Sequence, residues 1–238
     1  MFKKYIKYII SISILFLSTP VFAGSLDIGR DQDSIHMDPI LVNQNADVWV
    51  LNNMHSLIVR NNREATGIEA DLAESWNISA DGKKYTFNLR DNLKFNDGTP
   101  LKSSDAKFSI ERLRDGEGSV FGSMFNIIES IDTPDDRTIV FNLKEASTPF
   151  LTFLAIFAAA IVPEDQVTND YDNWVKKSTG AGAFKMTKWS KGDKLVLEKN
   201  PYYWESGLPK LDQVTWHYIP NDNTRIIKMQ AGELAAMI

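Results

Sequence analysis

Histidine, serine and cysteine are the residue types most often found at catalytic and metal centres, and this sequence offers few arrangements of them. Its three histidines, His36, His55 and His217, lie far apart and show no His-Glu-x-x-His or other metal-ligand spacing. A zinc site needs such spacing, so we predict no metal site. The chain contains no cysteine and no Gly-x-Ser-x-Gly segment, which removes the commonest sequence signs of a hydrolase. These residues give no support to an enzyme or to a bound cofactor.

Two further segments have part of a ligand-binding pattern. Gly180-Ala181-Gly182 lacks the Gly-Lys-Ser/Thr that completes a phosphate-binding loop, so we predict a tight turn there. Asp31-Gln32-Asp33 lacks the glycine and the terminal glutamate of a calcium loop, so we predict solvated surface.

The composition excludes several classes of protein. The chain has 238 residues, of which 43% are hydrophobic and 24% charged, and this excludes a disordered chain, a collagen and a disulfide scaffold. Its formal net charge is −5, and without the three lysines of the first seven residues the remainder carries −8. A nucleic-acid-binding protein needs a basic face, so we expect no nucleic-acid partner. The length suits one or two domains.

The amino terminus has the layout of a secretory signal peptide. Lys3, Lys4 and Lys7 precede the apolar run 8–17, and small residues follow up to Ala23. An uncleaved membrane anchor is the alternative, but the run is short against the roughly 20 residues that span a bilayer. We therefore predict a signal peptide over 1–23, cleaved after Ala23. Because the chain has no cysteine to acylate, we expect a periplasmic protein that is not a lipoprotein.

Period-two alternation predicts the strands. Two hairpins are expected, with turns at Asp81-Gly82 and at residues 133–136, and three more strands lie between 184 and 218. Residues 97–100 predict a turn that leads to a helix capped by residues 103–105. The apolar run 150–162, bounded by two prolines, predicts a buried helix, and residues 220–224 predict the cap of another that ends near Gly232. Strands and helices alternate without a regular βαβ repeat, so we expect an α/β or α+β domain with a mixed sheet.

Several sequence blocks resemble the family 5 extracellular solute-binding proteins, the peptide-, nickel- and haem-binding receptors of ABC importers. The blocks are Asp38-Pro39, DLAESWNISADGKKYTFNLR (71–90), KFNDGTPLKSSD (94–105), FSIER (108–112), STGAGAFK (178–185), LEKNPYYW (197–204) and QAGEL (230–234). They occur in the family's order and cover essentially the whole chain after residue 23. Ala181, Ala183, Tyr202 and Ala235 depart from the family's usual residues.

The resemblance implies lobe I of a type II periplasmic binding protein. In that arrangement residues 24–41 plus 172–238 would form an incomplete core subdomain with a mixed sheet, and residues 42–171 a smaller α/β subdomain. The family's second lobe has no counterpart here, so we expect a chain truncated before that lobe.

The resemblance also implies how a ligand is held. Family members close two lobes over their ligand, and the closed form docks on a permease in the inner membrane. From its position after Asp38-Pro39, the segment Asn43, Gln44, Asn45 and Ala46 is expected to line the cleft. A solvated loop is the alternative for this polar stretch.

We therefore predict a monomeric periplasmic solute-binding protein of an ABC importer, with peptides as the expected solutes. Nickel, haem or another small solute remains open. The alternatives are a secreted single-lobe module that binds a protein or wall fragment, an exported hydrolase, and a non-functional fragment.

Overall fold

The strand nearest the amino terminus, residues 25–30, lies between two strands from the last part of the chain, residues 213–218 and 236–237. The computed structural model describes residues 24–238, so the predicted signal peptide lies outside the described residues. The five-stranded sheet has the order β11-β1-β10-β9-β8. Its strands are β1 (Ser25–Arg30), β8 (Phe184–Ser190), β9 (Lys194–Lys199), β10 (Gln213–Tyr218) and β11 (Ala236–Met237). Strand β1 runs parallel to β10 and β11, and the other pairs are antiparallel, which confirms a mixed sheet.

A second, antiparallel sheet is built from two hairpins. Its strands are β4 (Ala73–Ile78), β5 (Lys84–Leu89), β6 (Ile128–Asp132) and β7 (Thr138–Leu143), in the order β4-β5-β7-β6. Both predicted hairpins are confirmed. Gly82 has a φ of +68°, the left-handed conformation that glycine adopts without strain at such a turn. The short strands β2 (Val59–Asn61) and β3 (Ile68–Ala70) form a third, two-stranded sheet.

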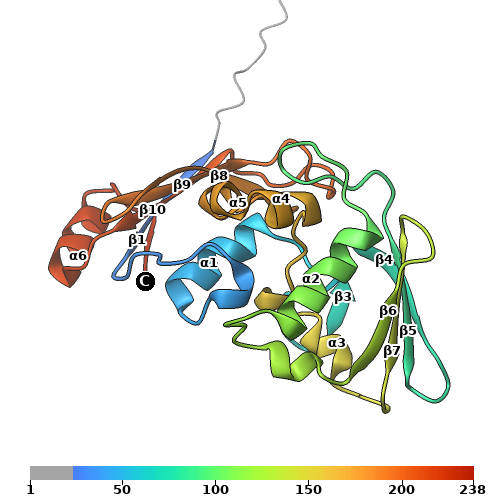
Figure 1. Ribbon diagram of the computed structural model, residues 1–238. Coiled ribbons are helices and arrows are strands. Elements are labelled where there is room, and N and C mark those ends of the chain that lie inside the picture. The colour runs from blue at the N-terminus through green and yellow to red at the C-terminus, as the bar shows by residue number, and fades with distance from the viewer. Residues whose placement is uncertain (1–23) are drawn as a thin grey trace, which may run out of the picture.

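Figure 1 shows the two larger sheets at opposite ends of the molecule, with most of the helices between them. The α-helices are α1 (Asn45–Met54), α2 (Ser103–Asp115), α3 (Phe150–Phe153), α4 (Glu164–Asn169), α5 (Tyr171–Lys177) and α6 (Asp222–Gln230). Three short 3-10 helices cover Pro39–Leu41, Gly122–Phe125 and Phe157–Ala159. No described helix combines the length and the apolar character needed to cross a membrane.

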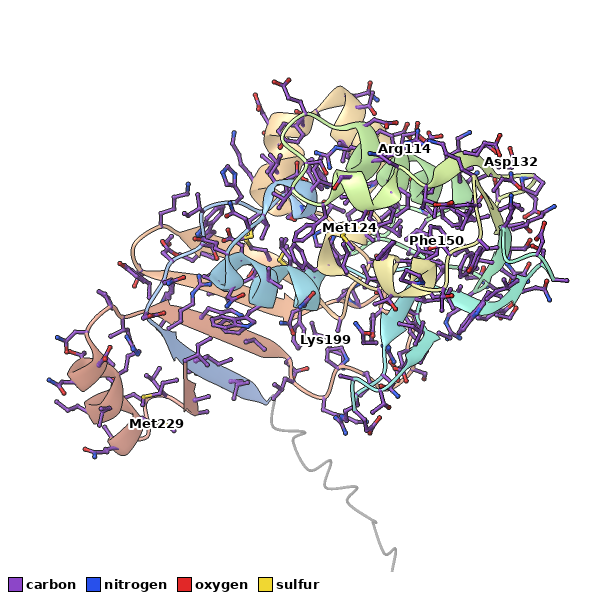
Figure 2. All side chains as sticks on the ribbon, turned by 90° about the horizontal axis from the view of Figure 1, so that it is seen from below. Arg114, Met124, Asp132, Phe150, Lys199 and Met229 are labelled. Atoms are coloured by element: carbon purple, nitrogen blue, oxygen red, sulfur yellow. The ribbon has the colours of Figure 1, made fainter. Side chains whose placement is uncertain are left out.

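Two hydrophobic clusters hold these layers together. The larger one fills the space between the four-stranded sheet and α2, and includes Phe87, Phe141 and Phe150. Figure 2 shows Met124 and Phe150 among its crowded side chains, while Met229 lies apart on α6. The second cluster joins the five-stranded sheet to α1 through Val50 and Met54. The division into 24–41 plus 172–238 and 42–171 stays a prediction.

The predicted helix over residues 150–162 is wrong, although its burial is right. The segment forms only α3 and the 3-10 turn Phe157–Ala159, with Ile156 extended between them. The rings of Phe153 and Phe157 pack against two other phenylalanines, and the Ile161 amide donates to the Ser56 carbonyl at 3.1 Å. These tertiary contacts outweigh the helical preference of an alanine- and leucine-rich run.

Two local predictions are confirmed only in part. Residues 181–183 form a bend without the hydrogen bond of a tight turn, and the two glycines allow close contact with the end of α1. A β-carbon on Gly180 would lie 2.4 Å from both His55 Nδ1 and the Met54 carbonyl oxygen. Of the predicted cap residues 103–105, Asp105 does cap α2, because its carboxylate accepts the Lys102 amide at 2.8 Å, but the helix already begins at Ser103. The α6 cap is confirmed, since Asn221 accepts the Thr224 amide at 2.9 Å.

Candidate functional site

The predicted ligand-binding segment forms the start of α1. Asn43 is exposed, Gln44 precedes the helix, and Asn45 and Ala46 lie in its first turn. Ala46 is buried, and its carbonyl oxygen accepts a hydrogen bond from Arg30 at 2.8 Å. The polar groups that the segment presents to solvent are therefore those of Asn43 and Asn45, with Gln44 half-buried. Their contact with a ligand stays a prediction.

A buried aspartate fixes this segment to the loop after β1. Asp47 is 1% exposed, and its carboxylate accepts the backbone amides of Ile35 and His36 at 2.8 and 3.3 Å. It also accepts the Gln44 side-chain amide at 2.9 Å. A carboxylate at the first turn of a helix satisfies free amide groups and interacts favourably with the helix dipole. The start of α1 is thus held in a defined position.

The buried Arg30 stabilises the same region from the protein interior. Its side chain is fully buried, and its guanidinium donates to Ser34 Oγ at 3.0 Å and to Asp33 Oδ1 at 3.3 Å. Burial lowers the pKa of Arg30, and the nearby carboxylates Asp33 and Asp47 oppose that shift. Asp33 also accepts the Gly192 amide, so the predicted solvated loop 31–33 is only partly solvated. Arg30 links β1, this loop and α1.

A hollow of about 510 Å³ lies at the other end of α1. We call it the α1–β2 hollow. Five apolar side chains line it, namely Leu57, Phe121, Ala155, Ile156 and Phe157. The polar lining consists of Asn52, Ser56, Arg60, Asn61, Asp71 and Tyr203. An apolar wall with a few converging polar groups is the usual form of a small-ligand site.

Asp71 is the buried charged group of the α1–β2 hollow, at 4% exposure. Its carboxylate accepts the Leu57 amide at 2.7 Å and the Trp204 indole N–H at 3.1 Å. Burial raises the pKa of Asp71 to about 6, although these hydrogen bonds and Arg60 favour the charged form. The same burial, reinforced by the negative charge of Asp71, raises the pKa of Tyr203 to about 12.

Cationic and aromatic side chains surround the Trp204 ring. The guanidinium of Arg90 lies 3.9 Å from the ring centroid and that of Arg60 lies 5.7 Å from it. Arg60 also donates to Glu69 at 2.7 Å and lies 3.6 Å from Glu205. These contacts tie the segment after β9 to β2 and β3.

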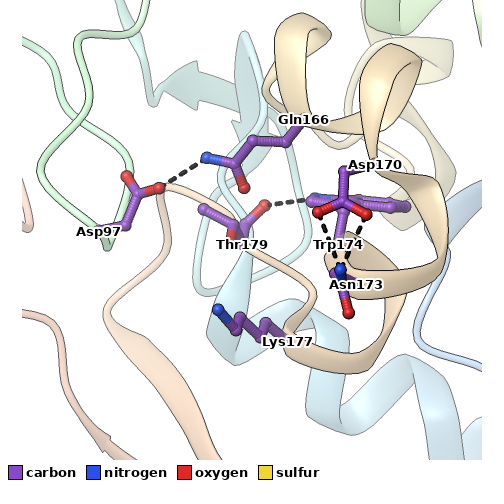
Figure 3. Close-up of a pocket in the computed structure, with 7 residues that line it drawn as sticks. All are labelled: Asp97, Gln166, Asp170, Asn173, Trp174, Lys177 and Thr179. Atoms are coloured by element: carbon purple, nitrogen blue, oxygen red, sulfur yellow. Dashed lines mark hydrogen bonds between the residues drawn. The ribbon is translucent and has the colours of Figure 1, made fainter.

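A smaller hollow of about 280 Å³ lies between α4, α5 and the turn at Asp97 (Figure 3). Its polar groups satisfy one another, because the Gln166 side chain donates to Asp97 at 2.6 Å and the Trp174 indole to the Thr179 carbonyl at 3.2 Å. Trp174 is buried and belongs to a small apolar cluster. This hollow offers less to a ligand than the α1–β2 hollow.

One histidine and serine pair is close enough to resemble a catalytic pair, but it lies in the interior. His55 Nε2 is 2.9 Å from Ser178 Oγ, and both residues are buried. The Ser178 hydroxyl donates its hydrogen to the Met37 carbonyl, so Nε2 of His55 is the donor in the hydrogen bond between His55 and Ser178. Burial lowers the pKa of His55 to about 4, which makes it a weak base. Within residues 24–238 no group of three or more acidic or histidine side chains has the arrangement of a metal site.

Sequence reasoning missed the α1–β2 hollow. Its lining comes from the end of α1, from β2, and from residues 71, 121, 155–157 and 203, which are far apart in the sequence. The one available signal was Asp71, a charged residue directly before the apolar pair Leu72-Ala73. The expected segment 43–46 and the hollow lie at opposite ends of the same helix.

The fold resembles the lobe of a periplasmic binding protein. The solved peptide complex of DppA from Helicobacter pylori, an ABC transporter-associated periplasmic binding protein with the peptide STSA, has a TM-score of 0.82 and 33% identity. That match covers 90% of this chain and 46% of the other. AgaA of A. tumefaciens, solved with agropinic acid, has a TM-score of 0.84 and 31% identity over 89% of this chain and 43% of the other. The class is a type II periplasmic binding protein with a mixed α/β lobe.

The family follows from the sequence. The model of the bacterial extracellular solute-binding proteins, family 5 Middle, matches residues 67–238, and the chain belongs to this family. A probable D,D-dipeptide-binding periplasmic protein of Escherichia coli, DdpA, is 33% identical over 219 residues, which are 88% of this chain and 42% of the relative. The chain therefore spans less than half the length of the relatives it matches. The family consists of substrate-binding proteins of ABC transporters and is not enzymatic.

Proposed function

We propose that the protein acts in the periplasm as the peptide-binding receptor of an ABC importer and passes its ligand to an inner-membrane permease. The observation that carries this proposal is the 33% identity to both the D,D-dipeptide-binding relative and the peptide-bound DppA structure. The α1–β2 hollow and the start of α1 supply the two surfaces for a ligand on this part of the receptor. A signal peptide over residues 1–23 that yields an unacylated, monomeric protein is part of the same proposal.

The ligand arrangement we propose uses both ends of α1. Asn43, Gln44 and Asn45 offer amide groups that pair with a peptide backbone, which is how extended ligands are commonly held. The apolar wall of the hollow suits a ligand side chain. Because the chain spans less than half of its relatives, we expect it to bind weakly when studied alone.

Titration of residues 24–238 with di- to pentapeptides tests the proposal. Calorimetry is expected to show little or no heat, while amide chemical shifts measured at millimolar peptide should move at residues 43–46 and around the α1–β2 hollow. Asn43→Ala with Asn45→Ala should abolish the first set of shifts, and Asn173→Ala, in the smaller hollow, is the matched control. Chemical-shift changes confined to other surfaces would overturn the peptide assignment. Micromolar binding would overturn the expectation that residues 24–238 alone bind a peptide only weakly.

The transport role has a separate test. The protein carrying an affinity tag is cross-linked in cells and recovered with its neighbours. Recovery of a permease supports the importer assignment. A different stable partner would instead favour a secreted single-lobe module.

A further inference from the structure

The two charged side chains that line the α1–β2 hollow balance each other. Within the described part of the chain, Asp71 is the carboxylate of the lining and Arg60 its cation. The Asp71 carboxylate accepts the Leu57 amide at 2.7 Å and the Trp204 indole N–H at 3.1 Å. Arg60 donates to Glu69 at 2.7 Å. A charged ligand group would lose hydration in this space and would find both charges already engaged, so the hollow favours an uncharged group.

Two phenylalanine rings stand almost at right angles in the apolar wall of the hollow. The ring centroids of Phe121 and Phe157 are 5.4 Å apart, and the ring planes are 88° apart. Both side chains are half-buried, because they pack against the larger hydrophobic cluster and also line the hollow. A third ring that enters the hollow can make edge-to-face or offset contacts with them, and such contacts add to the gain from burying apolar surface.

The break in the helix at Ile156 brings consecutive side chains to this wall. Ala155, Ile156 and Phe157 all line the hollow. Consecutive residues of an α-helix point in different directions, so a continuous helix over 150–162 would turn these three side chains to different faces. Ile156 is instead extended, with a φ of −85° and a ψ of 149°. The apolar wall therefore depends on the same packing that interrupts the helix.

We propose that the α1–β2 hollow selects an uncharged aromatic side chain of the ligand, with Phe121 and Phe157 as the residues that determine this preference. The inference rests on the proposed function, because it names the kind of peptide side chain that this surface takes. The volume of about 510 Å³ lies within the roughly 300–1,000 Å³ of small-ligand pockets, which leaves room for a phenyl or indole ring.

Blocked amino acids test the preference without the charged ends of a peptide. Isotope-labelled protein is titrated with the N-acetyl amides of phenylalanine, leucine, lysine and glutamate at matched ionic strength and about pH 7.5, where Asp71 is charged. The reporters are the Leu57 amide and the Trp204 indole N–H, and Trp204→Phe identifies the indole signal. We expect saturable shifts with the phenylalanine amide, about threefold weaker binding of the leucine amide, and at least about tenfold weaker binding of the two charged amides.

Phe157→Leu should remove the preference for the phenylalanine amide over the leucine amide, because it keeps the wall apolar but takes away one ring. Phe153→Leu is the matched control. Phe153 belongs to the same segment, is also half-buried against another phenylalanine, Phe125, and lies outside the lining of the hollow. It should retain the preference. An unchanged preference in Phe157→Leu would overturn the role of its ring.

The four amides on the unmodified protein test the inference even if Phe157→Leu fails to fold. Equal affinities for the charged and aromatic amides, or no saturable shift with the phenylalanine amide, would overturn it. Neither result would overturn the proposed function, which depends on peptide binding at the two ends of α1. Peptide shifts that avoid both ends of α1 would overturn the proposed function while the result with the amides stands, so the two failures are distinguishable.

Discussion

Arg112 holds Asp38 with both of its terminal guanidinium nitrogens. Asp38 belongs to the Asp38-Pro39 block and Arg112 to the block 108–112, so two segments that carry the family resemblance meet in one ion pair. The Asp38 side chain is fully buried, and the Tyr171 hydroxyl donates to it at 2.7 Å. Burial and this hydrogen bond raise the pKa of Tyr171 to about 12. The pair joins the entry to α1 with α2 and α5.

Arg112→Met should therefore destabilise the fold strongly. It leaves a buried carboxylate without its partner, and breaking a buried pair in this way costs about 3–5 kcal/mol. Urea denaturation measures the loss. Arg114→Met is the matched control on the same helix, since Arg114 pairs with exposed Asp115, and it should change the free energy of unfolding by less than about 1 kcal/mol. Equal effects of the two changes would contradict the structural role of the Asp38 pair.

His55 should make the protein less stable in mild acid. The pKa of His55 is lowered from 6.5 to about 4 in the folded protein, so the unfolded chain binds the proton more readily. The contribution is fully present above about pH 6.5 and is lost as the pH falls towards 4, by roughly 3 kcal/mol when complete. His55→Gln should remove this part of the pH dependence of unfolding. His36→Gln, at an exposed histidine, should retain it, and an identical pH profile for His55→Gln and the unmodified protein would refute the assignment.

Asp71 should change the pH dependence of stability in the opposite direction to His55. Its pKa is raised from 3.8 to about 6, so its contribution to stability is fully present below about pH 3.8 and is lost as the pH rises through 6. Asp71→Asn should remove that decline, measured as the free energy of unfolding between about pH 4 and pH 7. Because His55 and Asp71 change stability in opposite directions over this range, His55→Gln should reveal a gain on acidification. Absence of any change in slope for Asp71→Asn counts against a buried, ionisable Asp71.

Gly180→Ala should be poorly tolerated. The added β-carbon meets His55 Nδ1 and the Met54 carbonyl oxygen at 2.4 Å, and the carbonyl is backbone that cannot turn away. Overpacking of this kind costs typically about 1–3 kcal/mol. Gly67→Ala is the control, because its nearest neighbour would be the Asn62 side chain at 3.8 Å. Thermal unfolding should show a lower midpoint for Gly180→Ala alone, and an unchanged midpoint would show that the segment 180–182 can move away from α1.

Most strands of the two large sheets could be predicted from alternation, because one face of each sheet packs against a hydrophobic cluster. Strands β1 and β11 could not, since β1 has no alternating burial and β11 has only two residues. The segment 150–162 could not, since its backbone follows the packing of Phe153 and Phe157 rather than its own helical preference. The candidate ligand-binding site was harder to predict than these elements. The hollow around Asp71 is assembled from segments that only the tertiary fold brings together, and no local pattern marks its apolar wall.

The place of β1 between β10 and β11 sets an order for folding. Residues 25–30 find their sheet partners only at 213–218 and 236–237, so the five-stranded sheet cannot be completed until nearly all of these residues are available. Pairings this distant in sequence make folding slow, because loop closure is unfavourable before the contacts that reward it have formed. Strand β1 has no sheet partner until residues 213–218 have been synthesised, so both of its edges stay unpaired over most of the time that the chain is being made.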